Sequence, residues 1–356
     1  MLRILGLGLG LLSLVASACT SSASEGEVRC TDGVCEPKSV FVSGSIKMIL
    51  VTPDTVYAAD GSRCGVYAAA KPIEAAAIVL ARDACGVSSL ARTDWGIFWS
   101  TRTQKDIADR DTKGVLAWVP DGQSAPIVLD PALSKPGGIA AIGDTVFVAV
   151  ADGIRMLGRN STALEPVIEA TEPHALRSFG GAIYWQEGLG GIYSWRTGDA
   201  KATKLTQTSA ADAVASPTDD VRFVVGTSGV YWHSGEFFGQ GGELLHVPLV
   251  GGKPEKLADL GTGVMKSLAL DDGAVYWAVA DSFLFPKNTT IHRMATSGGT
   301  DKVVVDLGAQ VEALQITPEG LYIAASQVLQ LDKDKVGMKA YGGPLLMLPR
   351  TVLDPP

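Results

Sequence analysis

The sequence lacks the features that mark nucleic-acid-binding proteins and the common enzyme classes. Lysine and arginine together number 30 against 38 aspartates and glutamates, and no basic cluster occurs, which argues against nucleic acid as a partner. No G-x-S-x-G, HExxH, Walker A or GxGxxG motif is present. Helical periodicity is not sustained anywhere beyond the first nineteen residues. These absences favour a strand-rich protein without a recognisable catalytic signature.

Histidine is scarce as well, with four residues in the whole chain. None of the four lies near a cysteine, so the sequence offers no zinc-type ligand set, and we predict no metal and no cofactor. His246 and His292 fall at matching positions of two sequence repeats, which indicates repeat ancestry rather than catalysis.

The N-terminus has the pattern of an export signal. Arg3 is followed by an apolar run over residues 4–15 and by three small residues, Ala16 to Ala18. This segment is too short for a stable membrane-spanning helix and is typical of a secretory signal peptide covering residues 1–18. Ordinary secretion of the chain is one interpretation.

A cysteine directly follows this signal, so the segment resembles the lipobox of bacterial lipoproteins. Ala16 stands where most lipoboxes carry leucine. The resemblance implies that Cys19 is acylated and that a lipid, such as palmitate, anchors the chain to a membrane. Residues 19–38 are mostly small, polar or acidic, and we predict a flexible tether there.

The odd cysteine count agrees with one modified thiol. If Cys19 carries lipid, four cysteines remain for two disulfides in an oxidising compartment. Cys64 and Cys85 are predicted to lie at the same face of the fold, and Cys30 and Cys35 flank a short turn. These two bridges are our preferred pairing, although four cysteines allow three pairings.

A short phrase, in which an aliphatic residue precedes one or two aromatic residues, occurs seven times. The copies begin at positions 56, 97, 146, 183, 230, 275 and 321, in steps of 37–49 residues. A period near 45 residues in a strand-rich chain is typical of a β-propeller with one four-stranded blade per period. We therefore predict an all-β, seven-bladed β-propeller of four-stranded antiparallel blades over residues 39–350, with a tail over 351–356.

The last repeat is one strand short, and a spare strand precedes the first repeat. An open ring would leave two unpaired strand edges. We expect residues 40–42 to pair in the seventh blade, so that this N-terminal strand closes the ring. The repeated aromatic residues would then fill the wedges between neighbouring blades; stacking on sugars or bases is the alternative interpretation.

The connecting loops fall into two classes. Those between the first and second strands of a blade, and between the third and fourth, are tight turns. The longer connections join strands two and three or successive blades, so they share one face, which is the expected binding face. The predicted binding-face residues are Arg102, Glu187, His233, Phe237, Phe238, Phe283 and Phe285. The four phenylalanines form either a partner-binding patch or a plug over the channel.

Polar residues near the starts of the inner strands are candidates for the central channel. They are Lys47, Ser88, His174, Lys266 and Glu312, of which His174, Lys266 and Glu312 are the preferred channel residues. The set is mixed in charge and does not make a metal cage. The alternative function is an exported hydrolase or lyase that uses the channel, with His174, Glu187 or His233 involved.

Some repeats resemble known propeller families. Residues 247–257 are similar to TolB-type repeats, and Ile183-Tyr184-Trp185 and Val275-Tyr276-Trp277 are similar to YWTD-type repeats without the final aspartate. The chain thus resembles degenerate propellers of bacterial envelope lipoproteins. This resemblance implies a lipid-anchored scaffold in the cell envelope, at the outer membrane, which binds a protein or glycan.

Overall fold

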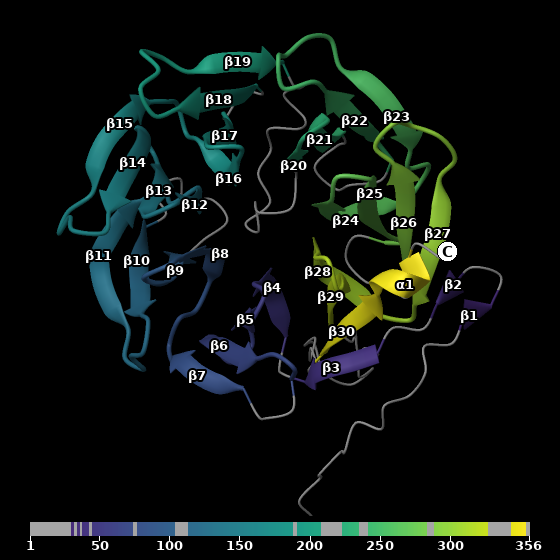
Figure 1. Cartoon of the computed structure of the whole chain (residues 1–356), viewed down its shortest axis with the longest axis horizontal. Helices are drawn as coiled ribbons and strands as arrows, with labels where there is room; N and C mark the ends of the chain where they lie inside the picture. Colours follow the sequence, from purple (N-terminus) through teal and green to yellow (C-terminus); the bar gives the residue numbers. More distant parts are fainter. Residues whose placement is uncertain are drawn as a thin grey trace, which may run out of the picture.

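The chain forms a ring of seven four-stranded antiparallel sheets, so the predicted seven-bladed β-propeller is confirmed (Figure 1). The computed structural model describes residues 30–31, 34–35, 38–42, 45–73, 77–103, 113–187, 191–207, 223–234, 241–282, 288–326 and 343–353. In blades one to six the strands follow chain order, with the first strand nearest the centre of the ring.

The first four blades occupy the N-terminal part of the ring. Their strands are β4 (Ile46–Val51), β5 (Thr55–Asp60), β6 (Gly65–Ala70) and β7 (Ile78–Ala81); β8 (Val87–Thr93), β9 (Gly96–Thr103), β10 (Lys113–Pro120) and β11 (Ile127–Ser134); β12 (Gly138–Ile142), β13 (Thr145–Val150), β14 (Gly153–Gly158) and β15 (Glu165–Glu169); and β16 (His174–Phe179), β17 (Ala182–Gln186), β18 (Ile192–Arg196) and β19 (Thr203–Thr206).

Blades five to seven complete the ring. Their strands are β20 (Phe223–Gly226), β21 (Gly229–Ser234), β22 (Glu243–Val247) and β23 (Glu255–Asp259); β24 (Val264–Leu270), β25 (Ala274–Ala280), β26 (Thr289–Ala295) and β27 (Lys302–Leu307); and β28 (Gln310–Ile316), β29 (Gly320–Ser326), β30 (Pro344–Pro349) and β3 (Lys38–Val42).

The N-terminal strand β3 supplies the fourth strand of blade seven, as predicted. It pairs antiparallel with β30, with Val42 opposite Pro344 and Lys38 opposite Met347. The two ends of the propeller sequence therefore meet in one sheet. This pairing covers the edge that β30 would otherwise expose to other chains.

The apolar core is divided among the seven wedges between neighbouring blades. In the second strand of each blade, consecutive side chains point to opposite faces of the sheet, so neighbouring aromatics enter different wedges. Trp277 is fully buried against blade five, beside Tyr231, whereas Tyr276 is buried against blade seven. Trp185 and Tyr184 divide in the same way between blades three and five. The aromatic repeats thus act in packing, as predicted.

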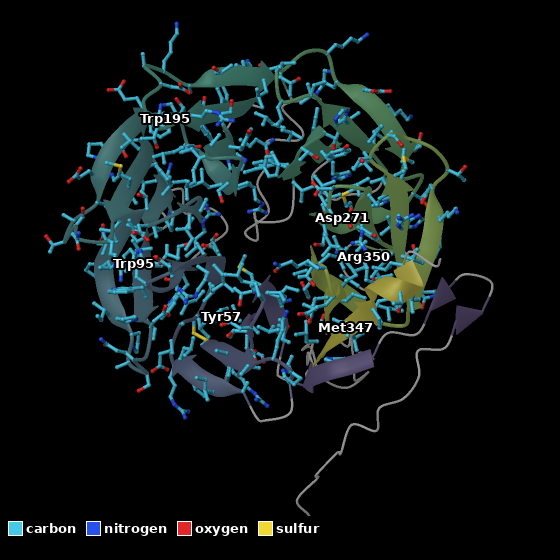
Figure 2. All side chains as sticks on the ribbon, in the orientation of Figure 1. Tyr57, Trp95, Trp195, Asp271, Met347 and Arg350 are labelled. Atoms are coloured by element: carbon cyan, nitrogen blue, oxygen red, sulfur yellow. A yellow bond between two sulfur atoms is a disulfide. The ribbon has the colours of Figure 1, made fainter. Side chains whose placement is uncertain are left out.

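The C-terminus forms one helical turn that ties blade seven to blade six. In α1 (Arg350–Leu353), Arg350 makes an ion pair with Asp271 of blade six (Figure 2). Leu353 is buried in the wedge between these two blades. The folded part therefore extends beyond residue 350, where the sequence analysis began a tail, because one apolar side chain completes the wedge.

Two further short strands lie ahead of the closing strand. β1 (Cys30–Thr31) and β2 (Val34–Cys35) form an antiparallel pair, with residues 30 and 35 directly opposite each other. This hairpin lies against β27, the outer strand of blade six (Figure 1). These two paired strands lie within residues 19–38, for which the sequence analysis predicts a tether.

The predicted bridge between Cys64 and Cys85 is present, with a Cα–Cα distance of 4.1 Å. It joins the connection after β5 to the connection before β8, so it ties blade one to the start of blade two. The chain-entropy model gives about 3 kcal/mol for a closed loop of this order. Within the ranges described, no helix has the length and apolar character needed to cross a membrane.

Candidate functional site

The two faces of the ring differ in their connections. Turns between first and second strands are short and closed by their own hydrogen bonds, as where the Thr52 N–H donates to the Thr55 carbonyl and the Asp271 N–H to the Ala274 carbonyl. We call this side the turn face. The opposite side, the loop face, carries the connections between strands two and three and between blades. In blade seven that connection runs from the end of β29 to the start of β30.

Innermost strands of several blades contain a β-bulge close to the loop face. The register of β4, β8, β24 and β28 with their partners skips one residue each, at Lys47, Ser88, Lys266 and Glu312 respectively. A bulge re-aims the extra side chain and shifts the alternation of side-chain faces along the strand by one residue. Four of the five channel residues from the sequence analysis therefore occupy one structural position in different blades.

Three of these bulges, on neighbouring blades, bring opposite charges together. The Lys47 Nζ lies 2.6 Å from Glu312 Oε1, which joins blade one to blade seven. The Ser326 hydroxyl donates to the same oxygen over 2.9 Å. The Glu312 side chain is 12% exposed and that of Lys47 36% exposed. We call Lys47, Lys266, Glu312 and Ser326 the channel-mouth cluster.

Lys266 is the second cation of this cluster and, like Lys47, is half-buried. Burial lowers the pKa of Lys266, the Glu312 carboxylate raises it, and the Lys47 charge lowers it. Two ammonium groups from blades one and six therefore share one carboxylate from blade seven. Such a group of fixed charges at the end of the central axis is suited to recognise a charged group of a partner.

The junction between blades seven and one carries further polar links. The Gln315 side chain accepts from the Val51 N–H at 2.8 Å and donates to the Val51 carbonyl at 3.0 Å. Lys71 lies 2.9 Å from Glu319, which lowers the pKa of Glu319, and Tyr322 donates to the same carboxylate. This is the junction that β3 closes, so the channel-mouth cluster depends on the closed ring.

Blade four presents a buried histidine at the loop face. His174 is 5% exposed, and its Nδ1 lies 3.1 Å from the Glu172 carbonyl, which makes Nδ1–H the donor. Its Nε2 is buried, and none of the residues that the structure describes forms a hydrogen bond with it. On the same blade, Trp185 donates to Glu187 Oε1 over 3.3 Å. Glu187 is thus held by a core tryptophan of its own blade.

The other predicted binding-face residues are spread around the ring. Arg102 lies near the end of β9 in blade two, where its backbone N–H donates to the Gly86 carbonyl. His233 lies in blade five, with its Nε2 3.3 Å from the Gly241 carbonyl. Arg102, Glu187 and His233 come from three different blades. Cys19 and the phenylalanines Phe237, Phe238, Phe283 and Phe285 lie outside the described residues.

Sequence reasoning missed a hydrogen-bonded series in blade six. The Thr290 hydroxyl lies 2.9 Å from His292 Nε2, and His292 Nδ1 lies 2.9 Å from Asp301. These residue types form nucleophilic triads in enzymes. Here Thr290 sits inside the sheet, paired with Val279 and Asp306. The series therefore orients His292, which stacks on Trp277, and fixes the turn that contains Asp301.

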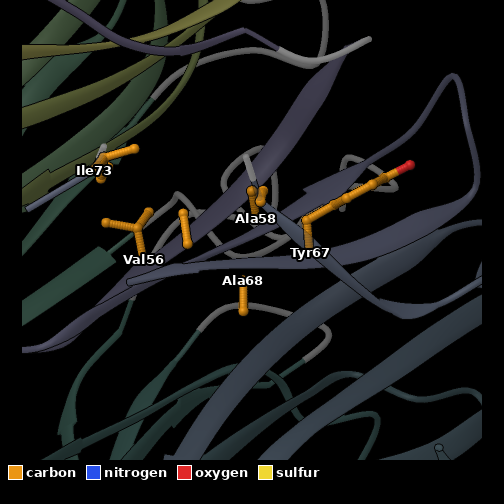
Figure 3. A pocket seen from close by; sticks show the side chains of 7 residues that line it. Val56, Ala58, Tyr67, Ala68 and Ile73 are labelled. Atoms are coloured by element: carbon orange, nitrogen blue, oxygen red, sulfur yellow. The ribbon is translucent and has the colours of Figure 1, made fainter. Parts of the chain in front are cut away.

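A small apolar pocket lies on blade one (Figure 3), and it encloses no space that a water molecule could occupy. Its lining includes Val56, Ala58, Tyr67 and Ile73. Ligand pockets usually measure about 300–1,000 Å³ and include polar groups. This pocket has neither property, so it does not supply a ligand site. Among the described residues, no three histidine, cysteine, aspartate or glutamate side chains gather as a metal site would require.

Comparisons with known proteins support the fold alone. No protein-family model matches the chain, and no curated protein matches it. YCF48 from Cyanidioschyzon merolae is similar in structure, with a TM-score of 0.56, 12% identity, and coverage of 86% of this chain and 96% of that one. The WD40 β-propeller domain of Doa1 has a TM-score of 0.54 and 11% identity, with 87% and 95% covered.

A prolyl endopeptidase structure is similar as well, with a TM-score of 0.50, 11% identity and 80% of this chain covered. The similarity spans only 46% of that peptidase. At these identities the likeness establishes the architecture and not the activity. The chain is a β-propeller.

Proposed function

We propose that this protein is an exported, lipid-anchored binding module of a bacterial cell envelope, which holds a protein or glycan partner at its loop face. The observation that carries the proposal is the difference between the two faces. On the turn face the connections between first and second strands are short, whereas the loop face carries the longest connections of the ring, which follow β9, β19, β21, β25 and β29, together with the channel-mouth cluster. Loops on a rigid scaffold are where binding residues gather.

Export and anchoring are supported by the sequence pattern around Cys19 and by the cysteine chemistry. The Cys64–Cys85 bridge is the kind of bond that persists in oxidising compartments. One thiol directly after a signal segment is then available for acylation. The resemblance of the repeats to degenerate propellers of bacterial envelope lipoproteins supports the same location, at the outer membrane.

Replacing Cys19 with serine should release the protein from membranes. One acyl chain contributes about 0.8 kcal/mol per buried CH₂, so its loss removes the anchor. The measurement is the share of protein in the membrane fraction, together with incorporation of labelled palmitate. Cys64→Ser is the matched control, because it removes a bridge thiol and should leave the label and the membrane share unchanged. Equal labelling of the Cys19→Ser chain would contradict the anchor.

Partner binding should map to the loop face. A photo-cross-linking amino acid placed at Glu187 or Lys47 should capture a partner in intact envelopes, because both positions lie at that face. The same group at Val250, which is 92% exposed on the turn face, is the control. Capture by the Val250 chain alone, or equally by all three, would contradict the assignment of the face.

The charges of the channel mouth should contribute to that binding. We expect Lys47→Ala to weaken capture by the Glu187 cross-linker about tenfold, since a charged hydrogen bond contributes about 1.5–3 kcal/mol. The Lys204→Ala variant, on the outer strand of blade four, is the control and should bind normally.

A further inference from the structure

The outer strands of all blades share one register, which allows their exposed residues to be compared position by position. Each outer strand begins with two residues paired to the third strand, followed by a one-residue bulge. The bulged residues are Leu80, Leu129, Val167, Leu205, Leu257, Val304 and Val40. The two residues before each bulge are therefore equivalent in all seven blades.

These pairs are polar in most blades and apolar in two. In blades three, four, five and seven they are Glu165-Pro166, Thr203-Lys204, Glu255-Lys256 and Lys38-Ser39. Charged residues and proline at such positions prevent edge strands from pairing with other chains. Blades one and two carry Ile78-Val79 and Ile127-Val128 instead. These four side chains are 61%, 36%, 42% and 56% exposed.

The apolar pairs lie on neighbouring blades, at the outermost strands β7 and β11 (Figure 1). Among the described residues, no strand pairs with the outer edge of either. Blade six is intermediate, with Lys302-Val303, and the β1–β2 hairpin lies against its outer strand. The chain thus covers one partly apolar rim strand with its own hairpin and leaves the two more apolar ones open.

We propose that the rims of blades one and two join two copies of this protein side by side. A two-fold axis parallel to the central axis of the ring brings β7 of one copy against β11 of the other, and β11 against β7. Both contacts form at once, as an isologous interface requires. Within one copy, β7 and β11 run in the same direction along the ring axis, because both are the fourth strand of a blade. The two-fold rotation leaves that direction unchanged, so β7 of one copy runs parallel to β11 of the other.

Side-chain chemistry fits this pairing. In register, Val79 lies beside the partner's Val128, and Ile78 beside the partner's Ile127. Arg82, exposed just after β7, comes within one residue of the partner's Asp130. Apolar residues thus meet apolar ones, and opposite charges meet at the end of the strand. The two loop faces point the same way, which suits two copies anchored in one membrane; that last argument alone rests on the proposed function.

Sedimentation equilibrium of the full chain in detergent solution tests the proposal. We expect a dimer. The variants I78T/V79K and I127E/V128K, which copy the residues of blades four and five, should each weaken association by on the order of 100-fold. T203A/K204A in blade four is the matched control and should remain dimeric. A monomeric wild type would overturn the proposal and assign these strands to another protein or to lipid.

Disulfide cross-linking tests the proposed strand register, in which Val79 lies beside the partner's Val128, and it leaves the apolar interface largely intact. Copies carrying V79C and copies carrying V128C, mixed before oxidation, should form a covalent dimer, and either copy alone should not. Equal cross-linking of V79C with itself would overturn the arrangement. Both experiments measure mass, so failure of loop-face binding leaves their outcome unaffected, and failure of the dimer leaves the loop-face proposal standing.

Discussion

A chain that lacks residues 38–43 should lose roughly 2–4 kcal/mol of stability and self-associate. The deletion removes the four residue pairs that join β3 to β30, and a net backbone hydrogen bond contributes about 0.5–1.5 kcal/mol. It also exposes β30 as an open edge next to the junction of blades seven and one. Chemical denaturation and light scattering measure the two effects.

Deletion of residues 20–29 is the matched control, because it shortens the same region and leaves β1 to β3 in place. That chain should unfold at the wild-type denaturant concentration. A synthetic peptide of residues 38–43 should restore part of the lost stability by binding the open edge. An unchanged unfolding midpoint in the chain without β3 would show that blade seven is stable with three strands and that the ring needs no closing strand.

Trp277→Ala should destabilise the protein by about 3–5 kcal/mol, the usual cost of removing a buried tryptophan. The Trp277 side chain is fully buried in the wedge between blades five and six, beside Tyr231, and stacks on His292. Removal of the indole leaves a cavity between the sheets of blades five and six. The cavity can close only if one of these sheets moves toward the other. The denaturant midpoint should fall while the slope of the transition stays constant.

Two further variants sharpen this test. Trp277→Phe should cost clearly less than the alanine variant, because the indole N–H has no hydrogen-bond partner among the described residues and the phenyl ring still fills much of the wedge. Val250→Ala, at a residue that is 92% exposed, should stay within about 0.5 kcal/mol of wild type. A midpoint shift for Trp277→Ala no larger than that for Val250→Ala would contradict the packing role.

The sequence was most informative about the repeating sheet. The seven predicted blades coincide with the seven four-stranded sheets, because the repeated aromatic phrase and the turn residues that separate strands are local signals. The closing strand was also predictable. The last repeat lacks its fourth strand, and a spare strand precedes the first repeat, so each end of the sequence supplies what the other needs. The turn of helix ending in Leu353 was not, because four residues carry no period and its place depends on the wedge that it fills.

The candidate site was predictable only in part. Lys266 and Glu312 were identified as channel residues from their places near the starts of inner strands. The ion pair between Lys47 and Glu312 was not foreseen, since it joins the first and last blades and exists only in a closed ring. The bulges that aim these side chains were not predicted, because a bulge is defined by how a strand pairs with its neighbour and not by the residues of one strand alone.

The register that joins Val42 to Pro344 also dictates when the fold can be finished. Residues 38–42 leave the ribosome long before their partner strand, residues 344–349, is translated. Until then the nascent chain carries a β-segment without its partner ahead of blade one. Closure of the ring therefore waits for β30, and a chain whose translation stops short of Pro344 cannot close the ring, however many complete blades it contains.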